Sequence, residues 1–249
     1  MSQVELKNIG FSIEKHSILN SVSAVFKEKT LTCILGPNGA GKTTLIQSIC
    51  RLIDYSGEIT IDGQSIQSLS SQDLARQVSY VPQSISSDIS FTVEEFILLS
   101  RYPWQGLSQL DQQKMDDIIE ITGLKNHLKQ TMNTLSGGER QRALIAAALI
   151  QDTPVILLDE ITSALDPCYQ EQMVNLLIEI RNTGKTLLWT THDLTAALLY
   201  SDSILTLKDG QVFATGVAEE LIENGTFNKL YDRKFEVLQH PSLPKKILI

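Results

Sequence analysis

The fold is decided by the stretch Gly36-Pro37-Asn38-Gly39-Ala40-Gly41-Lys42-Thr43-Thr44, which lies between an apolar run at 31–35 and a helical pattern that begins at Lys42. Its spacing, a glycine followed after four residues by Gly-Lys-Thr, is that of a phosphate-binding loop between a strand and a helix. The glycines let backbone N–H groups turn inward, and the positive end of the helix adds to this cradle for phosphate oxygens. We expect Lys42 to reach the β- and γ-phosphates of a nucleoside triphosphate and Thr43 to ligate Mg²⁺. The alternative, a glycine-rich turn with a surface lysine, leaves the order of strand, loop and helix unexplained.

The composition indicates a globular protein without a nucleic-acid footprint. The chain has 249 residues, 42% of them hydrophobic, which is enough for one large domain or two intimate lobes with a sizeable core. Its formal net charge is −8 and it contains no basic run, so we expect no nucleic-acid partner. Cys33, Cys50 and Cys168 have no metal-ligand spacing, and reduced cytoplasmic thiols are the simplest interpretation.

Neither a signal peptide nor a membrane span is expected from the sequence. The first residues lack a basic segment followed by an apolar one. The longest apolar run, at 143–150, is far shorter than the ~18 residues that a membrane span requires. We therefore expect any membrane role to come through a partner protein.

Strand and helix patterns alternate along most of the chain and predict an α/β fold with a parallel sheet, whose ligands lie at the carboxyl ends of the strands. The expected strands are 4–13, 18–26, 31–35, 58–61, 78–81, 155–158, 187–191, 203–207 and 211–215. The first two, joined by a polar turn at 14–17, form a hairpin and suggest a small antiparallel layer. Helices are expected to begin at 42 and at about 71, and further helices are expected at 93–99, 112–121, 139–150, 170–181 and 194–200.

Helical periodicity dominates the middle of the chain, so we predict a helical lobe inserted into the α/β core. Within a single domain at 1–249, we place the core at 1–84 and 152–235, the helical subdomain at 85–151 and a tail at 236–249. These borders are loose, because the composition does not change toward a linker at either edge.

Two carboxylates end the apolar strand at 155–158. Adjacent side chains of an extended chain point in opposite directions, so Asp159 and Glu160 can serve different purposes. We expect Asp159 to hold Mg²⁺ and Glu160 to orient and polarise an attacking water. Two solvated carboxylates would be the simpler interpretation if the chain had no phosphate-binding loop.

A second anion site is predicted at Leu135-Ser136-Gly137-Gly138-Glu139. Ser136 and Glu139 have the spacing of a capping box, so the modest interpretation is that a helix begins here. Two glycines expose bare backbone amides next to the Ser136 hydroxyl, which favours a phosphate-binding helix start.

Together these motifs, in this order, resemble the ATP-binding subunit of an ABC transporter over nearly the whole chain. Further matches are Gln83, Ser163-Ala164-Leu165-Asp166 and His192. The resemblance implies a P-loop NTPase fold: an α/β, RecA-like parallel sheet core with an N-terminal antiparallel β layer and an inserted α-helical subdomain. It implies ATP and Mg²⁺ as cofactors.

What the resemblance implies for the second anion site is a head-to-tail dimer. ATP bound to residues 36–44 of one copy would be clamped by Ser136, Gly137 and Gly138 of a second copy, with Asp166 across the interface. His192 would contact the γ-phosphate, and Gln83 would sense Mg²⁺ and the γ-phosphate as a catalytic and metal-site residue. A histidine at an ordinary helix start is the alternative for His192.

Two positions depart from the family pattern. Ile161 stands where the family usually has a proline after the catalytic glutamate, which loosens a turn but removes no chemistry. The aromatic ring that usually stacks on adenine falls at Ile13, with Phe11 two residues earlier. Apolar contact from Ile13 could partly replace the missing ring.

The segments Thr92-Val93-Glu94-Glu95-Phe96 and Arg101-Tyr102-Pro103-Trp104 resemble subunits that drive uptake of ferric siderophores, haem and cobalamin, most closely those for hydroxamate siderophores. The implied partners are integral membrane permease subunits and, indirectly, a substrate-binding protein, which would place the chain peripherally on the cytoplasmic face of the cell (inner) membrane. A local packing cluster is the alternative for 101–104.

The sequence leaves other functions open. One is a metal-ion importer, and another is an ABC exporter or lipid transporter with the same ATPase. A soluble ABC protein that acts on ribosomes or DNA ends is disfavoured by the single phosphate-binding loop and the negative charge.

Overall fold

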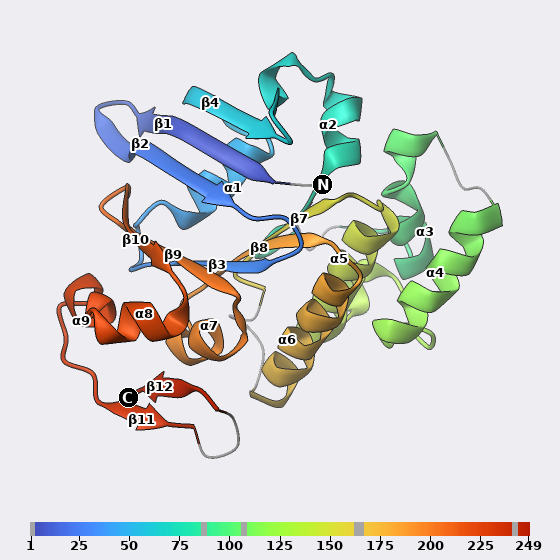
Figure 1. Ribbon diagram of the computed structural model, residues 1–249. Helices are drawn as coiled ribbons and strands as arrows, with labels where there is room; N and C mark the ends of the chain where they lie inside the picture. Colours follow the sequence, from blue (N-terminus) through green and yellow to red (C-terminus); the bar gives the residue numbers. More distant parts are fainter. Residues whose placement is uncertain (1–2, 86–88, 106–108, 162–166, 241–243) are drawn as a thin grey trace.

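The structure, a computed structural model, describes residues 3–85, 89–105, 109–161, 167–240 and 244–249 (Figure 1). Two sheets form its centre, a four-stranded antiparallel sheet with the order β2-β1-β4-β5 and a six-stranded sheet with the order β10-β9-β3-β8-β7-β6. The first comprises β1 (Val4–Ile13), β2 (His16–Phe26), β4 (Ser56–Ile61) and β5 (Gln64–Ser65). The second comprises β3 (Leu31–Leu35), β6 (Val78–Val81), β7 (Val155–Asp159), β8 (Thr186–Thr191), β9 (Ser203–Lys208) and β10 (Gln211–Gly216).

In the six-stranded sheet the neighbouring strands are parallel, except that β10 pairs antiparallel with β9. The phosphate-binding loop follows β3, and the two carboxylates stand at the end of β7, with β8 between these strands. Because parallel strands bring their carboxyl ends to one edge of the sheet, this register collects the predicted site residues there.

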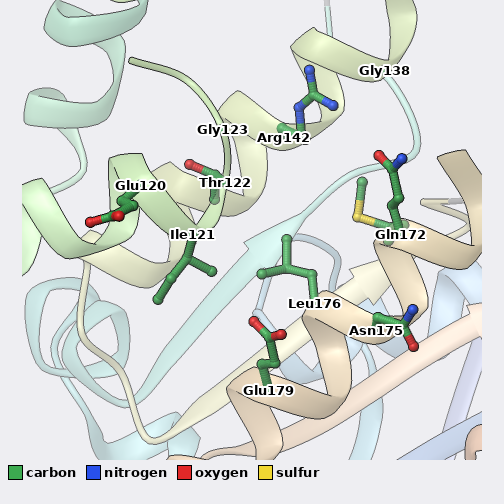
Figure 2. Close-up of a pocket in the computed structure, with 11 residues that line it drawn as sticks. Glu120, Ile121, Thr122, Gly123, Gly138, Arg142, Gln172, Asn175, Leu176 and Glu179 are labelled. Atoms are coloured by element: carbon green, nitrogen blue, oxygen red, sulfur yellow. The ribbon is translucent and has the colours of Figure 1, made fainter.

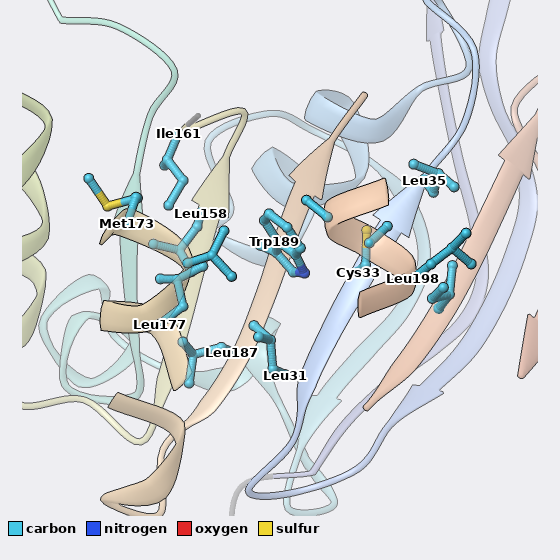
Figure 3. Close-up of a cluster of buried hydrophobic side chains, with 14 of the residues drawn as sticks. Leu31, Cys33, Leu35, Leu158, Ile161, Met173, Leu177, Leu187, Trp189 and Leu198 are labelled. Carbon is cyan, nitrogen blue, oxygen red and sulfur yellow. The ribbon is translucent and has the colours of Figure 1, made fainter. Parts of the chain in front are cut away.

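Side chains of the central strands alternate between two apolar clusters. Leu31, Cys33 and Leu35 of β3 lie in one cluster, and Ile34 lies in the other. The antiparallel sheet and α1 (Lys42–Ile49) cover the Ile34 face. Helices α5 (Gly137–Ile150), α6 (Pro167–Asn182), α7 (Leu194–Tyr200), α8 (Ala218–Glu223) and α9 (Thr226–Leu230) contribute to the other face. Trp189 and Leu187 of β8 belong to the same apolar cluster as Met173 and Leu177 of α6 (Figure 3). Both faces are therefore covered, as a parallel sheet requires.

Helix α5 belongs to two cores at once. Leu144 and Ile145 pack into the cluster on the sheet, whereas Ala143 and Ala146 pack into a third cluster with α3 (Val93–Leu99) and α4 (Gln109–Ile121). This double burial explains the unbroken apolar run at 143–150, since a helix buried on opposite sides needs no polar face. The helical subdomain also contains two 3₁₀ turns, η2 (Tyr102–Trp104) and η3 (Met132–Thr134).

Trp104 joins the helical subdomain to the core. The guanidinium carbon of Arg76, in α2 (Ser71–Gln77), lies 5.2 Å from the centroid of the indole, and that of Arg101 lies 5.3 Å from it. The indole Nε1 donates to the backbone oxygen of Gln151 at 2.7 Å. Residues 101–104 do pack together with the core, while Tyr102 is 83% exposed.

Asp152 forms a second link between the two lobes. Lys114 of α4 and Lys185, just before β8, both donate to its carboxylate at 2.7 Å. Burial alone would raise the pKa of Asp152, but the two ammonium groups outweigh it and lower the pKa to about 2. Asp152 is therefore held by one lysine from each lobe.

Several predicted elements have the bounds expected from the sequence, namely 4–13, 31–35, 78–81, 93–99 and 194–200. Others differ at their starts. The turn after β1 is shorter than predicted because β2 begins at His16, and α5 begins at Gly137 rather than 139 because Ser136 is its N-cap. Likewise α4 begins at Gln109 rather than 112, α6 at Pro167 rather than 170 and β4 at Ser56 rather than 58.

Some elements were not predicted at all. They are β5, η1 (Ile66–Ser68), α8, α9 and a hairpin of β11 (Val237–Gln239) and β12 (Lys246–Leu248). These segments are short, so they show too few periods of a pattern to be recognised. In the described parts of the chain, no helix has the length and apolar character needed to span a bilayer.

Candidate phosphate and hydrolysis site

The phosphate-binding loop is held against neighbouring backbone at two glycines. A Cβ on Gly36 would lie 2.3 Å from the carbonyl oxygen of Leu207, and one on Gly41 would lie 3.0 Å from the carbonyl oxygen of Ile18 and 2.7 Å from Leu19 Cδ2. Gly41 also has a φ of 96°, and it is the N-cap of α1. Because glycine has no side chain to cap the helix, the amides of the first turn are left for another acceptor, which suits a phosphate.

Lys42 folds back into this loop. Its side chain is only 5% exposed, and Nζ donates to the carbonyl oxygens of Gly36 at 2.9 Å and Pro37 at 3.3 Å. The same nitrogen lies 3.9 Å from Oε1 of Glu160. The structure thus brings the loop lysine and the predicted catalytic carboxylate to one place, with Asn38 and Gly39 exposed at the tip of the loop.

Asp159 is buried and accepts hydrogen bonds from three hydroxyl groups. Oδ1 accepts from Thr190 at 2.6 Å and from Thr43 at 3.1 Å, and Oδ2 accepts from Tyr80 at 3.5 Å. Burial, followed by the nearby Asp159 carboxylate, raises the pKa of Tyr80, so the phenol stays protonated and acts as the donor. The hydroxyl of Thr43 and the carboxylate of Asp159 are hard oxygen donors, which fit Mg²⁺.

Glu160 lies between Lys42 and Gln83. Its Oε2 accepts from Gln83 Nε2 at 2.9 Å, and its backbone N–H donates to Thr190 Oγ1 at 2.9 Å. Direct contact between Gln83 and Glu160 was not predicted from the sequence. The adjacent carboxylates do differ as expected, because Asp159 is 1% exposed whereas the Glu160 side chain is 20% exposed.

Thr190 and Tyr80 are site residues that sequence reasoning missed. Both stand in buried strands next to apolar neighbours, and Thr190 is fully buried. A buried hydroxyl needs a hydrogen-bond partner, so a hydroxyl in an apolar strand is the sequence feature that could have pointed to these two residues. The partner itself could not be named without the register that sets Thr190 opposite Asp159.

His192 follows β8 at the same edge of the sheet and is exposed. Among the described residues, no hydrogen bond or ion pair joins its ring to Glu160. The next residue, Asp193, caps α7 by accepting from the Ala196 N–H at 3.0 Å. The predicted roles of His192 toward a γ-phosphate therefore stay predictions, and Asp166 lies outside the described residues.

The candidate adenine contact at Ile13 is accessible. Ile13 is 57% exposed at the end of β1. Phe11, by contrast, is partly buried and packs against the cluster on the antiparallel layer. Ile13 is thus the more available of the two side chains.

The second predicted anion site forms a capped helix start. Ser136 N–H donates to Glu139 Oε2 at 2.8 Å, and Glu139 N–H donates to Ser136 Oγ at 3.4 Å. The backbone hydrogen bond from Ser136 lowers the pKa of Glu139. A Cβ on Gly137 would meet nothing within 4 Å, so the subunit's own packing does not require glycine there.

In the described chain, no hydrogen bond or ion pair links the helix start at Ser136, Gly137 and Gly138 to the phosphate-binding loop. A cavity of about 320 Å³ lies behind it, between α4, α5 and α6, with Gly138, Arg142 and Gln172 on its wall (Figure 2). Among the described residues of one copy, the two predicted anion sites are therefore not joined by a hydrogen bond or an ion pair.

A groove of about 1150 Å³ lies between α2 of the core and α3 and η2 of the helical subdomain. Its lining is mostly apolar and includes Phe91, Leu99 and Tyr102, which are 50%, 51% and 83% exposed. Exposed apolar side chains gathered in a groove indicate a protein contact.

Comparison with known proteins gives a consistent result. The sequence model of the ABC transporter family matches residues 19–163. The chain is similar to the petrobactin import ATP-binding protein FpuD of Bacillus anthracis, with 32% identity over 96% of this chain and 89% of that protein. It is also similar to the iron(3+)-hydroxamate import ATP-binding protein FhuC of Bacillus subtilis, with 28% identity over 100% of this chain and 95% of that one. Among solved structures, a nucleotide-free ATP-binding cassette from an ABC transporter matches with a TM-score of 0.82 and 25% identity, over 93% of this chain and 98% of that chain.

Proposed function

Because the chain belongs to the ABC transporter family, we propose that it is the ATP-hydrolysing subunit of an importer whose cargo is a ferric siderophore or a related iron, haem or cobalamin compound. The observation that carries the proposal is the position of Glu160, in contact with Gln83 and 3.9 Å from the loop lysine Lys42. Two relatives are named as ATP-binding proteins for the import of petrobactin and of iron(3+)-hydroxamate. These names support import as the direction of transport and a ferric siderophore as the class of cargo.

Within this proposal, the loop residues 36–44 bind the phosphates of ATP. Lys42 turns from the carbonyl oxygens of its own loop to the β- and γ-phosphates, which are stronger partners for an ammonium group. Thr43 and Asp159 would hold Mg²⁺, which would neutralise charge on the phosphates. Glu160 accepts a hydrogen bond from the attacking water and so orients and polarises it. Gln83 fixes the direction of the Glu160 carboxylate.

The complete site requires a second copy of the chain. Ser136 and Gly137 are exposed at a helix start, and Gly137 leaves open space where an incoming phosphate could approach the amides. The helix start of one copy would complete the binding site for ATP on the phosphate-binding loop of the other copy. His192 and Asp166 would complete the contact to the γ-phosphate and to the opposing subunit.

The groove between α2, α3 and η2 would receive an integral permease subunit. Phe91, Leu99 and Tyr102 supply the apolar contact that a short helix of the permease needs. Through this contact the chain would sit peripherally on the cytoplasmic face of the membrane, and a substrate-binding protein would act only indirectly, on the other side of the permease. ATP binding closes the dimer and hydrolysis releases it, which moves the helical subdomains against the permease.

The test is uptake of radiolabelled iron in cells whose own copy of this gene has been deleted. The wild-type chain should restore uptake of ferric hydroxamates or of another ferric siderophore, and Glu160→Gln should not. In purified form, Glu160→Gln should still bind ATP while its turnover falls at least about a hundredfold, which corresponds to about 2.7 kcal/mol in activation free energy. Glu179→Gln, on the exposed face of α6, is the matched control and should behave as wild type.

Two results would contradict the proposal at different points. Full turnover by Glu160→Gln would remove the role of Glu160 in hydrolysis. Unchanged uptake of ferric siderophores, haem and cobalamin in the deletion strain would reject the proposed class of cargo without contradicting the proposed ATP hydrolysis. It would favour a metal-ion importer or an exporter.

A further inference from the structure

Thr190 is a buried polar residue at the centre of the hydrolysis site. It stands near the end of β8, between β3 and β7, and pairs in register with Ile34 on one side and Asp159 on the other. Its relative exposure is 0%. Apolar side chains fill the same face of the sheet, so a hydroxyl at this depth must be matched by specific partners.

The hydroxyl of Thr190 makes two hydrogen bonds whose directions are fixed. The backbone N–H of Glu160 can only donate, so Thr190 Oγ1 accepts from it at 2.9 Å. The hydroxyl proton is then free to go to Asp159 Oδ1, 2.6 Å away. One side chain therefore links the backbone of Glu160 to the carboxylate of Asp159.

The backbone at Glu160 needs such a contact. Glu160 has a φ of 47°, in the left-handed region, which is unfavourable for a residue with a side chain. Its neighbours are anchored, since Asp159 is 1% and Ile161 2% exposed, and Ile161 packs with Met173 and Leu158 (Figure 3). Strained backbone persists where the surroundings determine it, and here the Glu160 N–H is held by Thr190.

The contact to Asp159 is independent of the phosphate-binding loop. Thr43 donates to the same oxygen, Oδ1, from α1 at 3.1 Å. If the Thr43 oxygen turns to a metal ion, that contact weakens. Thr190 holds Asp159 from inside the sheet and does not depend on that change.

We propose that Thr190 is a positioning residue for ATP hydrolysis, which fixes Asp159 toward the metal and fixes the turn that directs Glu160 toward Gln83 and Lys42. This inference rests on the proposed roles of Asp159 and Glu160. Thr190 is fully buried and its hydroxyl is bonded to Asp159 and to the backbone of Glu160, so it acts through these two carboxylate residues. It follows that its hydroxyl should matter for turnover and for the response to Mg²⁺ but not for binding of the nucleotide itself.

The test compares variants that keep or remove this hydroxyl. Thr190→Val keeps the shape of the side chain without the hydroxyl, and Thr190→Ser keeps the hydroxyl without the methyl group. Thr186→Val is the matched control, because Thr186 is equally buried at the other end of β8 and also accepts a backbone hydrogen bond, from Lys29 N–H at 2.9 Å. All are made in the full-length chain.

Three quantities are measured: steady-state ATP hydrolysis at varied ATP, its dependence on Mg²⁺ concentration, and binding of a fluorescent ATP analogue in EDTA. We expect Thr190→Val to lower kcat at least about tenfold and to raise the Mg²⁺ concentration at half-maximal rate, with metal-free binding of the analogue within about twofold of wild type. Thr190→Ser should recover most of kcat. Thr186→Val should keep the wild-type kcat and Mg²⁺ response.

Wild-type kcat and Mg²⁺ response in Thr190→Val would overturn the inference. Equal loss in Thr190→Val and Thr190→Ser would also overturn it, because the methyl group and packing would then be responsible. Should Thr190→Val fail to fold, Thr190→Ala takes its place, since it differs from Thr190→Ser only by the hydroxyl oxygen. These outcomes are separate from a failure of the proposed function, which Glu160→Gln with full turnover would reveal.

Discussion

Replacing Trp104 by alanine tests how firmly the helical subdomain is joined to the core. The indole lies between Arg76 and Arg101 and donates to the Gln151 carbonyl oxygen. Each cation–π contact at a partly exposed ring contributes about 0.5–1 kcal/mol, and the indole hydrogen bond about 1 kcal/mol. We therefore expect Trp104→Ala to lower the free energy of unfolding by about 2–3 kcal/mol, or Tm by about 4–12 °C for a chain of this size.

The assay is urea and thermal denaturation followed by circular dichroism. Trp104→Phe keeps an aromatic face but loses the N–H, so it should lose only about 1 kcal/mol. A double-mutant cycle of Trp104→Ala with Arg76→Met should give a coupling energy of about 0.5–1 kcal/mol. Binding of an ATP analogue should stay at the wild-type level, because Trp104 contacts Arg76, Arg101 and the backbone of Gln151 rather than the phosphate-binding loop.

A loss below about 0.5 kcal/mol in Trp104→Ala, the range of an ordinary surface substitution, would refute this reasoning. So would a coupling energy near zero between Trp104 and Arg76. Either result would mean that the ring covers the surface without joining the two lobes.

Three further predictions concern a clash, a cap and a charge. Gly36→Ala should abolish binding of an ATP analogue and lower Tm, because the new Cβ would lie 2.3 Å from the Leu207 carbonyl oxygen and the backbone there cannot move aside easily. Wild-type affinity for the analogue in a fluorescence titration would contradict this. Ser136→Ala removes the N-cap of α5 and should cost about 1 kcal/mol in urea denaturation, while a single copy still binds ATP normally and turnover is lost. Asp152 has a folded pKa of about 2, below its unfolded value of about 3.9, so it stabilises the fold above that value and loses this contribution as the pH falls toward the folded pKa. After discounting for solvent exposure, Asp152→Asn should lower the free energy of unfolding by about 1 kcal/mol at neutral pH, a difference that should shrink when denaturation is repeated at successively lower pH below about 4.

The sequence was sufficient for those parts of the site that lie within one local motif. The phosphate-binding loop, the capping box at Ser136 and the pair Asp159 and Glu160 are each defined by spacing over a few residues. Local spacing determines which backbone amides and side chains can face one ligand, so these predictions needed no knowledge of the sheet.

Contacts between distant strands could not be predicted in this way. Thr190 meets Asp159, 31 residues away in the chain, and Tyr80 meets the same side chain across 79 residues. Which residues face each other depends on strand order and register, and a shift of one residue would turn Thr190 to the opposite face. The contact of Gln83 with Glu160 depends on the order of β6 and β7 for the same reason.

Helix α5 connects the groove to the second anion site, and this gives the Trp104 variants a functional consequence. Arg101 donates to the Ile150 carbonyl oxygen at the end of α5, at 3.1 Å, and Trp104 donates to the next residue, while Ser136 caps the start of the same helix. Fourteen residues of helix span about 21 Å and bend little. The junction at Trp104 therefore adds to the packing of α3 against α5 in carrying a displacement of the groove to Ser136. We therefore expect Trp104→Ala in the assembled transporter to lower iron uptake more than ATP hydrolysis. Equal losses of both would mean that the groove and α5 move together without this junction.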